Sequence, residues 1–360
     1  MRELIKDILK ERSSYLDTVL NECHGKDIVL FGASVAGKHA PSYLKKNNIS
    51  VKYYCDNDPS KHGRIYNGIE CVSPSKLLDI HPPPFVLITS SYVNDIRRQL
   101  HDLGLEHIYN LPLLGSPIET QQLFDGELYH RNDKAVMKLY DELEDDKSKM
   151  VLLKIIKLRK TGDFSQLDDI VEEDMYFPQD IISLDNNECF IDGGAYTGDT
   201  AEQFIINVNN EFEKIYVFEP DKINYNLLSK KYITDSRVEA INKGLDVKNR
   251  ILNFNSGKMM ESMVSDSGED QIEVVSLDSL IHDKITFVKM DIEGAELEAL
   301  HGMKNIINNQ KPKMSICVYH KPEHLWEIPL FLKNSNPDYQ LFLRHHSISV
   351  TDTVCYATNK

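Results

Sequence analysis

A short apolar run followed at once by closely spaced glycines constrains the fold of this chain more than any other feature. The run Cys189–Ile191 is typical of a buried strand, and a glycine-rich loop at 193–198 follows it. Residues 201–206 have helical character, with Asp199 and Glu202 spaced as a capping box. A strand, a tight turn and a helix N-terminus in this order predict an open α/β sheet with a ligand site at the strand end.

The residue directly before the glycines indicates the charge of the ligand. A pyrophosphate-binding loop presents backbone N–H groups to negative charge, but here Asp192 stands at the strand end. A carboxylate there would repel a phosphate and attract a cation. S-adenosylmethionine carries both an ammonium and a sulfonium, so we predict that it binds at this loop. The alternative is an aspartate and glycines that only close a turn.

The composition excludes several classes of protein. The 360 residues are 41% hydrophobic and 27% charged, which is typical of a soluble globular chain of about two domains. No apolar run approaches the roughly 18 residues of a membrane span. The net charge of -15 argues against binding to nucleic acid or to an anionic membrane surface. Widely spaced cysteines without a CxxC pair favour reduced thiols, and therefore a cytoplasmic location.

The chain before the glycine loop divides into three predicted parts. Residues 1–24 place apolar side chains at helical spacing, which predicts an amphipathic helix that packs on the protein or on a partner subunit, as in a homodimer. Residues 25–112 alternate strands and helices around the glycine turn at 32–37, which predicts a Rossmann-like α/β domain. Residues 113–180 predict a helical connector.

The predicted N-terminal α/β domain resembles the small Rossmann-like domain of several sugar-modifying enzymes. The resemblance rests on the Gly-Ala-Ser turn that begins at Gly32 and on the Asp-Asn-Asp-Pro stretch that begins at Asp56. It implies either a nucleotide-sugar site or a scaffold. Because the glycines are spaced GxxxxG and not GxGxxG, their phosphate-binding signal is weak. Gly32, Ser34 and Asp56 are the candidate substrate-binding residues of this domain.

The remaining residues, 181–360, alternate strands and helices and close with an antiparallel pair. This pattern predicts a doubly wound sheet of about seven strands. Residues 250–280 predict an inserted antiparallel excursion with a Gly-, Ser- and Met-rich tip. Glu219, Asp291 and His320 each follow a predicted strand. Since parallel strands end at one edge of a sheet, we expect these side chains at the ligand-binding edge.

Glu219 is placed to bind a ribose. A carboxylate at the end of the second strand can accept hydrogen bonds from both ribose hydroxyls. Glu219 therefore predicts a ligand that contains a nucleoside, and both NAD and S-adenosylmethionine contain one. The negative charge of Asp192 favours S-adenosylmethionine over NAD. The alternative is an ordinary strand end before Pro220.

Five motifs, in order, resemble those of the FkbM-type methyltransferases. They are Asp192–Thr200, Phe218–Pro220, Ser276–Asp278, Lys289–Glu296 and Thr353–Ala357. The resemblance spans nearly all of residues 185–360. It implies a class I methyltransferase fold, S-adenosylmethionine as cofactor and methyl transfer onto a hydroxyl oxygen.

The resemblance also implies roles for individual residues. Glu219 and Pro220 would hold the ribose, Gly244 would lie near the adenine, and Asp291 would lie beside cofactor and acceptor. The methionine end would be held by Asp192, Gly193, Gly194, Ala195, Tyr196, Thr197, Gly198, Asp199 and Thr200.

A sugar hydroxyl is a poor nucleophile and gains from a positioned base. His320 is the first candidate, because it ends a strand on the binding edge and an ordinary histidine has its pKa near working pH. Glu293 is the rival base, and Asp291 is the third catalytic candidate. A purely structural His320, or a Glu293 that caps the next helix, is the alternative. We predict no metal, although Asp291, Glu293 and His320 could hold a divalent ion.

Arg344, His345 and His346 form a basic cluster on an acidic chain, which indicates either an acceptor-binding site or an exposed hairpin loop. The chain is thus predicted to be an S-adenosylmethionine-dependent O-methyltransferase of carbohydrate biosynthesis. Its acceptor would be a saccharide, nucleotide-sugar or glycan-precursor hydroxyl. A sugar-nucleotide-binding or regulatory protein with a non-catalytic methyltransferase domain is the alternative. A second, weaker alternative is an NAD-linked oxidoreductase that binds its cofactor at the turn at 32–37.

Overall fold

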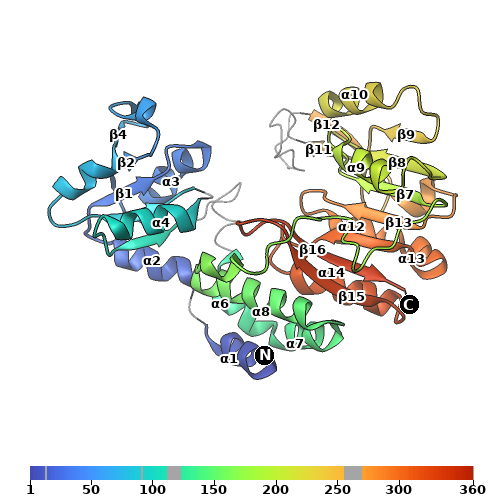
Figure 1. The fold of residues 1–360 in the computed structure, drawn as a ribbon, viewed down its shortest axis with the longest axis horizontal. Coiled ribbons are helices and arrows are strands. Elements are labelled where there is room, and N and C mark those ends of the chain that lie inside the picture. The colour runs from blue at the N-terminus through green and yellow to red at the C-terminus, as the bar shows by residue number, and fades with distance from the viewer. Residues whose placement is uncertain (13, 91, 112–122, 255–269, 360) are drawn as a thin grey trace. The chain divides into compact units, whose positions relative to one another are not determined.

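A computed structural model describes the chain apart from residues 13, 91, 112–122, 255–269 and 360 (Figure 1). The chain forms two compact units. The first unit comprises Met1–Lys134, Leu153–Asp169 and Ile348–Val350, and the second comprises Ala135–Leu152, Ile170–Ser347 and Thr351–Lys360. In the part of the chain that the structure describes, no helix is both long and apolar enough to cross a membrane.

The N-terminus forms two helices where the apolar spacing predicts one. They are α1 (Arg2–Lys10) and α2 (Tyr15–Cys23). The hydroxyl of Ser14 caps α2 by accepting a hydrogen bond from the backbone N–H of Asp17, so a second helix begins there. Helix α1 contacts α6 (Gly126–Arg131), so part of its apolar face is covered within the first unit.

The first unit contains a six-stranded sheet in the order β3-β4-β2-β1-β5-β6. Its strands are β1 (Ile28–Phe31), β2 (Val51–Cys55), β3 (Ile65–Tyr66), β4 (Ile69–Val72), β5 (Phe85–Ile88) and β6 (Ile108–Asn110). All neighbours pair in parallel except β3 and β4, which form an antiparallel hairpin. Helices α3 (Val35–Lys46) and α4 (Val93–Asp102) connect parallel strands, as in a Rossmann-like domain. Strands β1 and β5 are apolar and buried throughout, as parallel strands covered on both faces should be.

The second unit contains a seven-stranded sheet in the order β15-β16-β14-β13-β7-β8-β9. Its strands are β7 (Cys189–Gly193), β8 (Lys214–Phe218), β9 (Val238–Ile241), β13 (Phe287–Met290), β14 (Lys313–Cys317), β15 (Gln340–His345) and β16 (Thr353–Thr358). The five strands from β14 to β9 are parallel, and β16 runs antiparallel to both β14 and β15. This topology confirms the predicted doubly wound sheet with its closing antiparallel pair.

Helices accompany the second sheet, and an aromatic core fixes its central strands. The helices of its C-terminal part are α9 (Asp199–Asn207), α10 (Lys222–Lys231), α11 (Leu277–Leu280), α12 (Glu296–His301), α13 (Lys304–Gln310) and α14 (His324–Ser335). The ring of Phe190 on β7 stacks on Phe204 of α9 at 4.6 Å and on Phe287 of β13 at 5.0 Å between centroids. These rings hold β7, and therefore the loop that follows it, against α9 and β13.

Two helical segments join the units along the chain, namely α7 (Asp133–Glu142) and α8 (Asp146–Thr161). The predicted excursion is a small sheet in the order β10-β12-β11, made of β10 (Gly244–Leu245), β11 (Arg250–Phe254) and β12 (Asp270–Val275). Strands β11 and β12 pair in antiparallel fashion, as expected. The Gly-, Ser- and Met-rich tip lies outside the described residues.

Candidate active site

A cavity of about 580 Å³ lies at the carboxyl ends of the parallel strands of the second unit. Its walls are the loop after β7, the ends of β8 and β13, and the inserted strands β11 and β12. This volume falls in the range of cofactor sites, and its position is where an open α/β sheet binds ligands. Of the predicted cofactor residues, those that line it are Gly194, Tyr196, Asp199, Thr200, Glu219, Pro220, Gly244 and Asp291. Asp192, Gly193, Ala195, Thr197 and Gly198 are not among its described lining residues.

The glycine loop after β7 lies directly on the end of β13. Gly194 has a φ of +73°, and its N–H and that of Ala195 donate to the carbonyl of Phe218 at 3.1 and 3.0 Å. A Cβ atom on Gly194 would lie 1.9 Å from the backbone oxygen of Asp291. Only glycine satisfies both the left-handed backbone and this close approach.

Replacing Gly194 by alanine should therefore distort the loop. The left-handed backbone alone costs on the order of 1 kcal/mol, and displacing the backbone of Asp291 adds to it. Chemical denaturation would compare Gly194→Ala with Gly25→Ala, whose φ of +72° is similar but whose added Cβ would have no neighbour within 4 Å. We expect the larger loss of stability at Gly194, and equal losses would contradict the close approach.

Asp192 lies beneath the loop and not in the cavity. Its carboxylate is fully buried and lies 3.0 Å from the Nζ atom of Lys289, which is also buried. Burial alone would lower the pKa of Lys289, but the charges of Asp192 and Asp291 raise it, so the ammonium remains charged. The carboxylate is neutralised by a cation of the protein itself. This corrects the prediction that Asp192 selects a cationic ligand.

Lys289 is a site residue that the sequence analysis missed. Its ammonium donates to the carbonyl oxygens of Gly193 and Gly194 at 3.2 and 2.9 Å, so it supports the loop from below. Strand register places Lys289 directly opposite Asp192. A lysine inside an apolar strand needs a buried anionic partner, and that signal could have linked the two residues.

Glu219 follows β8 and faces the cavity with only 7% of its surface exposed. Its two carboxylate oxygens accept hydrogen bonds from the backbone N–H groups of Tyr196 and Asp221, both at 2.9 Å. Burial raises the pKa of Glu219 to about 7, and these hydrogen bonds offset only part of that rise. Each oxygen has a further lone pair, so the carboxylate can accept two ligand hydroxyls. The side chain of Asn242 donates to the carbonyl of Pro220 at 3.0 Å and so fixes the turn that presents Glu219.

Asp291 is held at the cavity wall by two phenols. The hydroxyl of Tyr176 donates to its Oδ2 atom at 2.8 Å, and that of Tyr319 donates to Oδ1 at 3.1 Å. Burial, with the charge of Asp291, raises the pKa of both tyrosines well above the ordinary value, so both remain donors. The two phenols thus fix the orientation of the carboxylate. Tyr176 also lines the cavity, and no sequence pattern indicated it.

His320 lies behind Asp291 and is not among the described residues that line the cavity. Its Nδ1 atom lies 2.9 Å from Glu296, and its Nε2 atom lies 3.4 Å from Asp291 and 3.5 Å from Glu293. Burial lowers the pKa of His320, but the charges of these carboxylates outweigh it and raise the pKa to about 9. An imidazole protonated at neutral pH cannot accept a proton. The surroundings therefore argue against the predicted role of His320 as a base.

Arg344 is a buried structural residue, with 1% of its side chain exposed. Its guanidinium pairs with Asp145 at 2.7 Å, with Asp180 at 3.2 Å and with Glu172 at 3.5 Å. The carboxylates come from segments far from Arg344 in the sequence, so its own neighbourhood does not reveal them. Arg344 connects β15 to these segments, and this corrects its predicted acceptor-binding role.

The two histidines after Arg344 are also engaged within the protein. His345 belongs to β15 and not to a loop, is fully buried, and contacts the hydroxyl of Thr353 at 2.9 Å through Nδ1. His346 contacts the hydroxyl of Tyr356 at 2.8 Å and the carbonyl of Glu172 at 3.0 Å. Neither is among the described cavity-lining residues. The basic cluster is therefore part of the closing hairpin and not the predicted acceptor site.

The candidate substrate-binding residues of the first unit, Gly32, Ser34 and Asp56, lie at a turn that is held by contacts within the protein. The Asp56 carboxylate accepts a hydrogen bond from the backbone N–H of Ala33 at 2.9 Å and pairs with Lys61 at 2.8 Å. Gly32 has a φ of +117°, and Ser34 occupies the N-cap position of α3 without a side-chain cap. The acidic group at the end of β2 therefore stabilises the glycine turn, which favours the scaffold interpretation over a nucleotide site.

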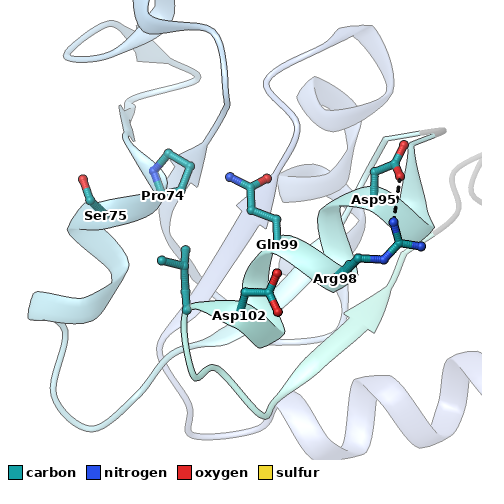
Figure 2. A pocket seen from close by; sticks show the side chains of 7 residues that line it. Pro74, Ser75, Asp95, Arg98, Gln99 and Asp102 are labelled. Atoms are coloured by element: carbon teal, nitrogen blue, oxygen red, sulfur yellow. Dashed lines mark ion pairs between the residues drawn. The ribbon is translucent and has the colours of Figure 1, made fainter.

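A shallow hollow in the first unit lies away from this turn. Figure 2 shows it between the segment at Pro74 and Ser75 and one face of α4. Asp95 and Arg98 on that face pair with each other at 3.9 Å, and both are strongly exposed. An exposed, self-paired surface of this kind does not form a site, and the cavity of the second unit remains the candidate.

Comparison with known protein families identifies the type of domain that the second unit contains. Residues 192–346 match the family model of the methyltransferase FkbM domain. This segment is an FkbM methyltransferase domain. The match covers the glycine loop, Glu219 and Asp291, so the cavity belongs to the methyltransferase domain. Residues 25–108 match a second family model, the C2185-like N-terminal domain.

Solved structures agree with the fold. The methyltransferase FkbM of Methylobacillus flagellatus KT matches with a TM-score of 0.82 at 24% identity, covering 98% of this chain and 95% of that one. An rRNA methylase of Streptococcus thermophilus matches at 12% identity and a TM-score of 0.33, covering 49% and 89% of the two chains. UDP-D-quinovosamine 4-dehydrogenase of Vibrio fischeri matches at 24% identity and a TM-score of 0.22, covering 25% and 80%. The first match shows the fold, and the other two are too distant to inform function. No curated protein sequence matches the chain.

Proposed function

We propose that the methyltransferase domain transfers a methyl group from S-adenosylmethionine to a hydroxyl oxygen of a saccharide, nucleotide sugar or glycan precursor. The observation that carries this proposal is the single cavity bordered by the glycine loop, Glu219 and Asp291. Buried Glu219 is suited to a ribose, and the glycine loop borders the same cavity, where it would hold the methionine end of the cofactor.

The charge of the cavity wall supports a cationic cofactor, although Asp192 does not contribute. Each basic side chain that lines the described cavity pairs with a carboxylate: Lys243 with Glu273, Arg250 with Asp246, Lys289 with Asp192, and Lys321 with Glu298. The wall also carries Asp199, Glu219 and Asp291. A wall with paired cations and additional carboxylates favours the ammonium and sulfonium of S-adenosylmethionine over a dinucleotide phosphate.

Methyl transfer requires the protein mainly to align two ligands. The bound cofactor would supply a methyl group already activated by its sulfonium. Glu219 would accept the ribose hydroxyls, and the loop at 193–198 would position the methionine end. Asp291, fixed by two phenols, would hold the acceptor hydroxyl, with Glu293 beside it on the same wall.

The lining of the cavity supports the proposed saccharide acceptor. Glu293, Glu298 and Lys321 give the acceptor side of the cavity a polar lining, which suits a polyhydroxylated molecule.

The six cysteines are buried and unpaired, which supports a reducing, cytoplasmic compartment.

Binding of the cofactor should stabilise the protein. S-adenosylmethionine or its demethylated product at 100 times Kd should raise the free energy of unfolding by about 2.7 kcal/mol, which a thermal melt detects. NAD and a nucleotide sugar serve as comparison ligands, because they test the alternative functions. A folded protein whose melting temperature responds to NAD and not to either adenosyl ligand would contradict the proposal.

A further inference from the structure

A buried group of charged side chains lies next to Asp291 and is not among the described residues that line the cavity. Its centre is the carboxylate of Glu296, which is fully buried at the first position of α12. The Oε1 atom of Glu296 accepts hydrogen bonds from the backbone N–H groups of Ile292 and Gly294 at 2.9 and 3.3 Å. These two bonds attach the carboxylate of Glu296 to the loop that carries Asp291.

Glu296 also pairs with two imidazoles. Its Oε1 atom lies 2.9 Å from Nδ1 of His320, and its Oε2 atom lies 3.3 Å from Nδ1 of His324. Burial raises the pKa of Glu296, but His320 and His324 outweigh burial and hold this pKa well below its usual range. A buried carboxylate that stays ionised needs a positive partner close by, and His320 is the nearer of the two.

His320 is an imidazolium that faces Asp291. Its side chain is only 9% exposed, and its Nε2 atom lies 3.4 Å from Oδ1 of Asp291 and 3.5 Å from Oε2 of Glu293. The carboxyl group of Asp352 also interacts with the charge of the ring. Although burial lowers the pKa of His320, the surrounding carboxylates, led by Glu296, raise it to about 9. The ring therefore carries a positive charge at neutral pH.

This group shares its composition with metal sites but not their chemistry. One possible ligand atom each from Asp291, Glu296 and His320 lies within 4.8 Å of the others. Both nitrogens of a protonated imidazole are donors, so His320 offers no lone pair to a metal ion. The group is therefore a network of charges that balance one another.

The imidazolium acts on Asp291 together with the two phenols. Tyr319 and His320 both approach Oδ1 of Asp291, and Tyr176 donates to Oδ2. The rings of Tyr319 and His320 lie 4.0 Å apart between centroids, so each limits the movement of the other. A carboxylate with partners on both oxygens keeps one orientation. The positive charge beside it also weakens the negative field that it projects into the cavity.

A weaker negative field suits methyl transfer from a sulfonium. When the methyl group leaves, the sulfur keeps the electron pair of the broken bond and becomes neutral. An unbalanced carboxylate beside the sulfur would therefore stabilise the bound cofactor more than the transition state. A carboxylate balanced by a fixed imidazolium can still accept a hydrogen bond from the acceptor hydroxyl, without this excess attraction for the sulfonium.

We propose that the imidazolium of His320, oriented by Glu296, is a positioning residue of the methyl-transfer site, which fixes the carboxylate of Asp291 and balances its charge. This inference rests on the proposed function, because that function places the sulfur of the cofactor beside Asp291. His320 itself does not touch either ligand and acts through Asp291.

Nuclear magnetic resonance of the full chain with labelled histidine measures the charge of His320 without any ligand. The signal that is absent from His320→Gln identifies the residue. We expect His320 to titrate near pH 9, and Glu296→Gln to move this titration toward 6.5, the ordinary value for histidine. His301 is the internal control, because it lies on the same helix as Glu296 with its ring on Phe331, and its titration should not change.

Calorimetric titration at neutral pH compares S-adenosylmethionine with S-adenosylhomocysteine. These ligands differ in the methyl group and in the charge on sulfur, so the ratio of their dissociation constants reports the charge beside the sulfur. His320→Gln should shift this ratio by about 3- to 10-fold in favour of S-adenosylmethionine, because a positive charge near the sulfonium is removed. Asp291→Asn should shift the ratio in the opposite direction, and His301→Gln should not change it.

Circular dichroism establishes that each variant is folded, and the titration of His320 in the wild type remains decisive if a variant is not. A wild-type His320 that titrates near 6.5 would overturn the proposal. An equal change of affinity for both ligands in His320→Gln would also overturn it, since a purely structural role affects both ligands alike. A folded wild-type protein that binds neither adenosyl ligand would contradict the proposed function and the positioning role with it, whereas an unchanged ratio with both ligands bound would contradict the positioning role alone.

Discussion

Lys289→Met is expected to lower the free energy of unfolding by about 3–5 kcal/mol, because it leaves the buried carboxylate of Asp192 without its partner. The variant also removes the ammonium that donates to the carbonyls of Gly193 and Gly194. The glycine loop should therefore lose its geometry, and binding of an adenosyl ligand should weaken with it. Denaturant unfolding measures the first effect, and calorimetric titration with S-adenosylhomocysteine measures the second.

Two further variants separate a buried ion pair from a general effect of removing lysine. Lys311→Met breaks an exposed pair with Asp338 and should change stability by no more than about 0.5 kcal/mol. The double variant Asp192→Asn with Lys289→Met leaves no unpaired charge, so its loss should be smaller than the sum of the single losses. Additive losses, or a Lys289→Met protein as stable as the wild type, would show that the two side chains do not act as a pair.

Glu219→Gln should weaken binding of S-adenosylhomocysteine by roughly 10- to 100-fold, because hydrogen bonds from the ribose to an ionised carboxylate are stronger than those to an amide. The pH dependence of S-adenosylhomocysteine binding is a more specific test of Glu219 than the loss of affinity alone. Burial raises the pKa of Glu219 to about 7, so the free protein holds this carboxyl protonated below that pH. The protonated form is the poorer acceptor. Affinity in the wild type should therefore rise as pH increases through about 7.

Calorimetric titration at a series of pH values checks this prediction. In Glu219→Gln the dependence on pH near 7 should disappear, because the amide does not titrate there. Glu202→Gln is the matched control, since Glu202 lies on the exposed side of α9 and pairs with Lys231. A wild-type affinity that does not change through pH 7, or a Glu219→Gln protein with unaltered affinity, would exclude Glu219 from the ribose site.

The features that sequence could predict depend on local pattern and on sheet topology. The strand, glycine loop and helix around residues 189–206 are encoded by neighbouring residues, so the loop was placed correctly. Glu219 and Asp291 follow strands of one parallel sheet, and that rule alone brings them to the same edge. The division of the N-terminus into α1 and α2 depends on a single cap at Ser14, which a spacing argument overlooks.

The features that sequence could not predict depend on partners distant along the chain. Asp192 was assigned to the ligand because its partner, Lys289, is brought opposite it only by the register of β7 and β13. His320 was assigned as a base because its ordinary pKa was assumed, whereas the carboxylates around it, led by Glu296, reverse its protonation. Arg344 appeared free because its carboxylate partners come from another part of the chain. In each case the charge was visible in the sequence and the partner was not.

A crystal structure of the protein with S-adenosylhomocysteine tests the central claim most directly. We predict the ribose hydroxyls on the Glu219 carboxylate, the homocysteine along the loop at 193–198, and the sulfur directed toward Asp291. A ligand bound outside this cavity, or an empty cavity at a saturating concentration of the ligand, would contradict the assignment of the cofactor site.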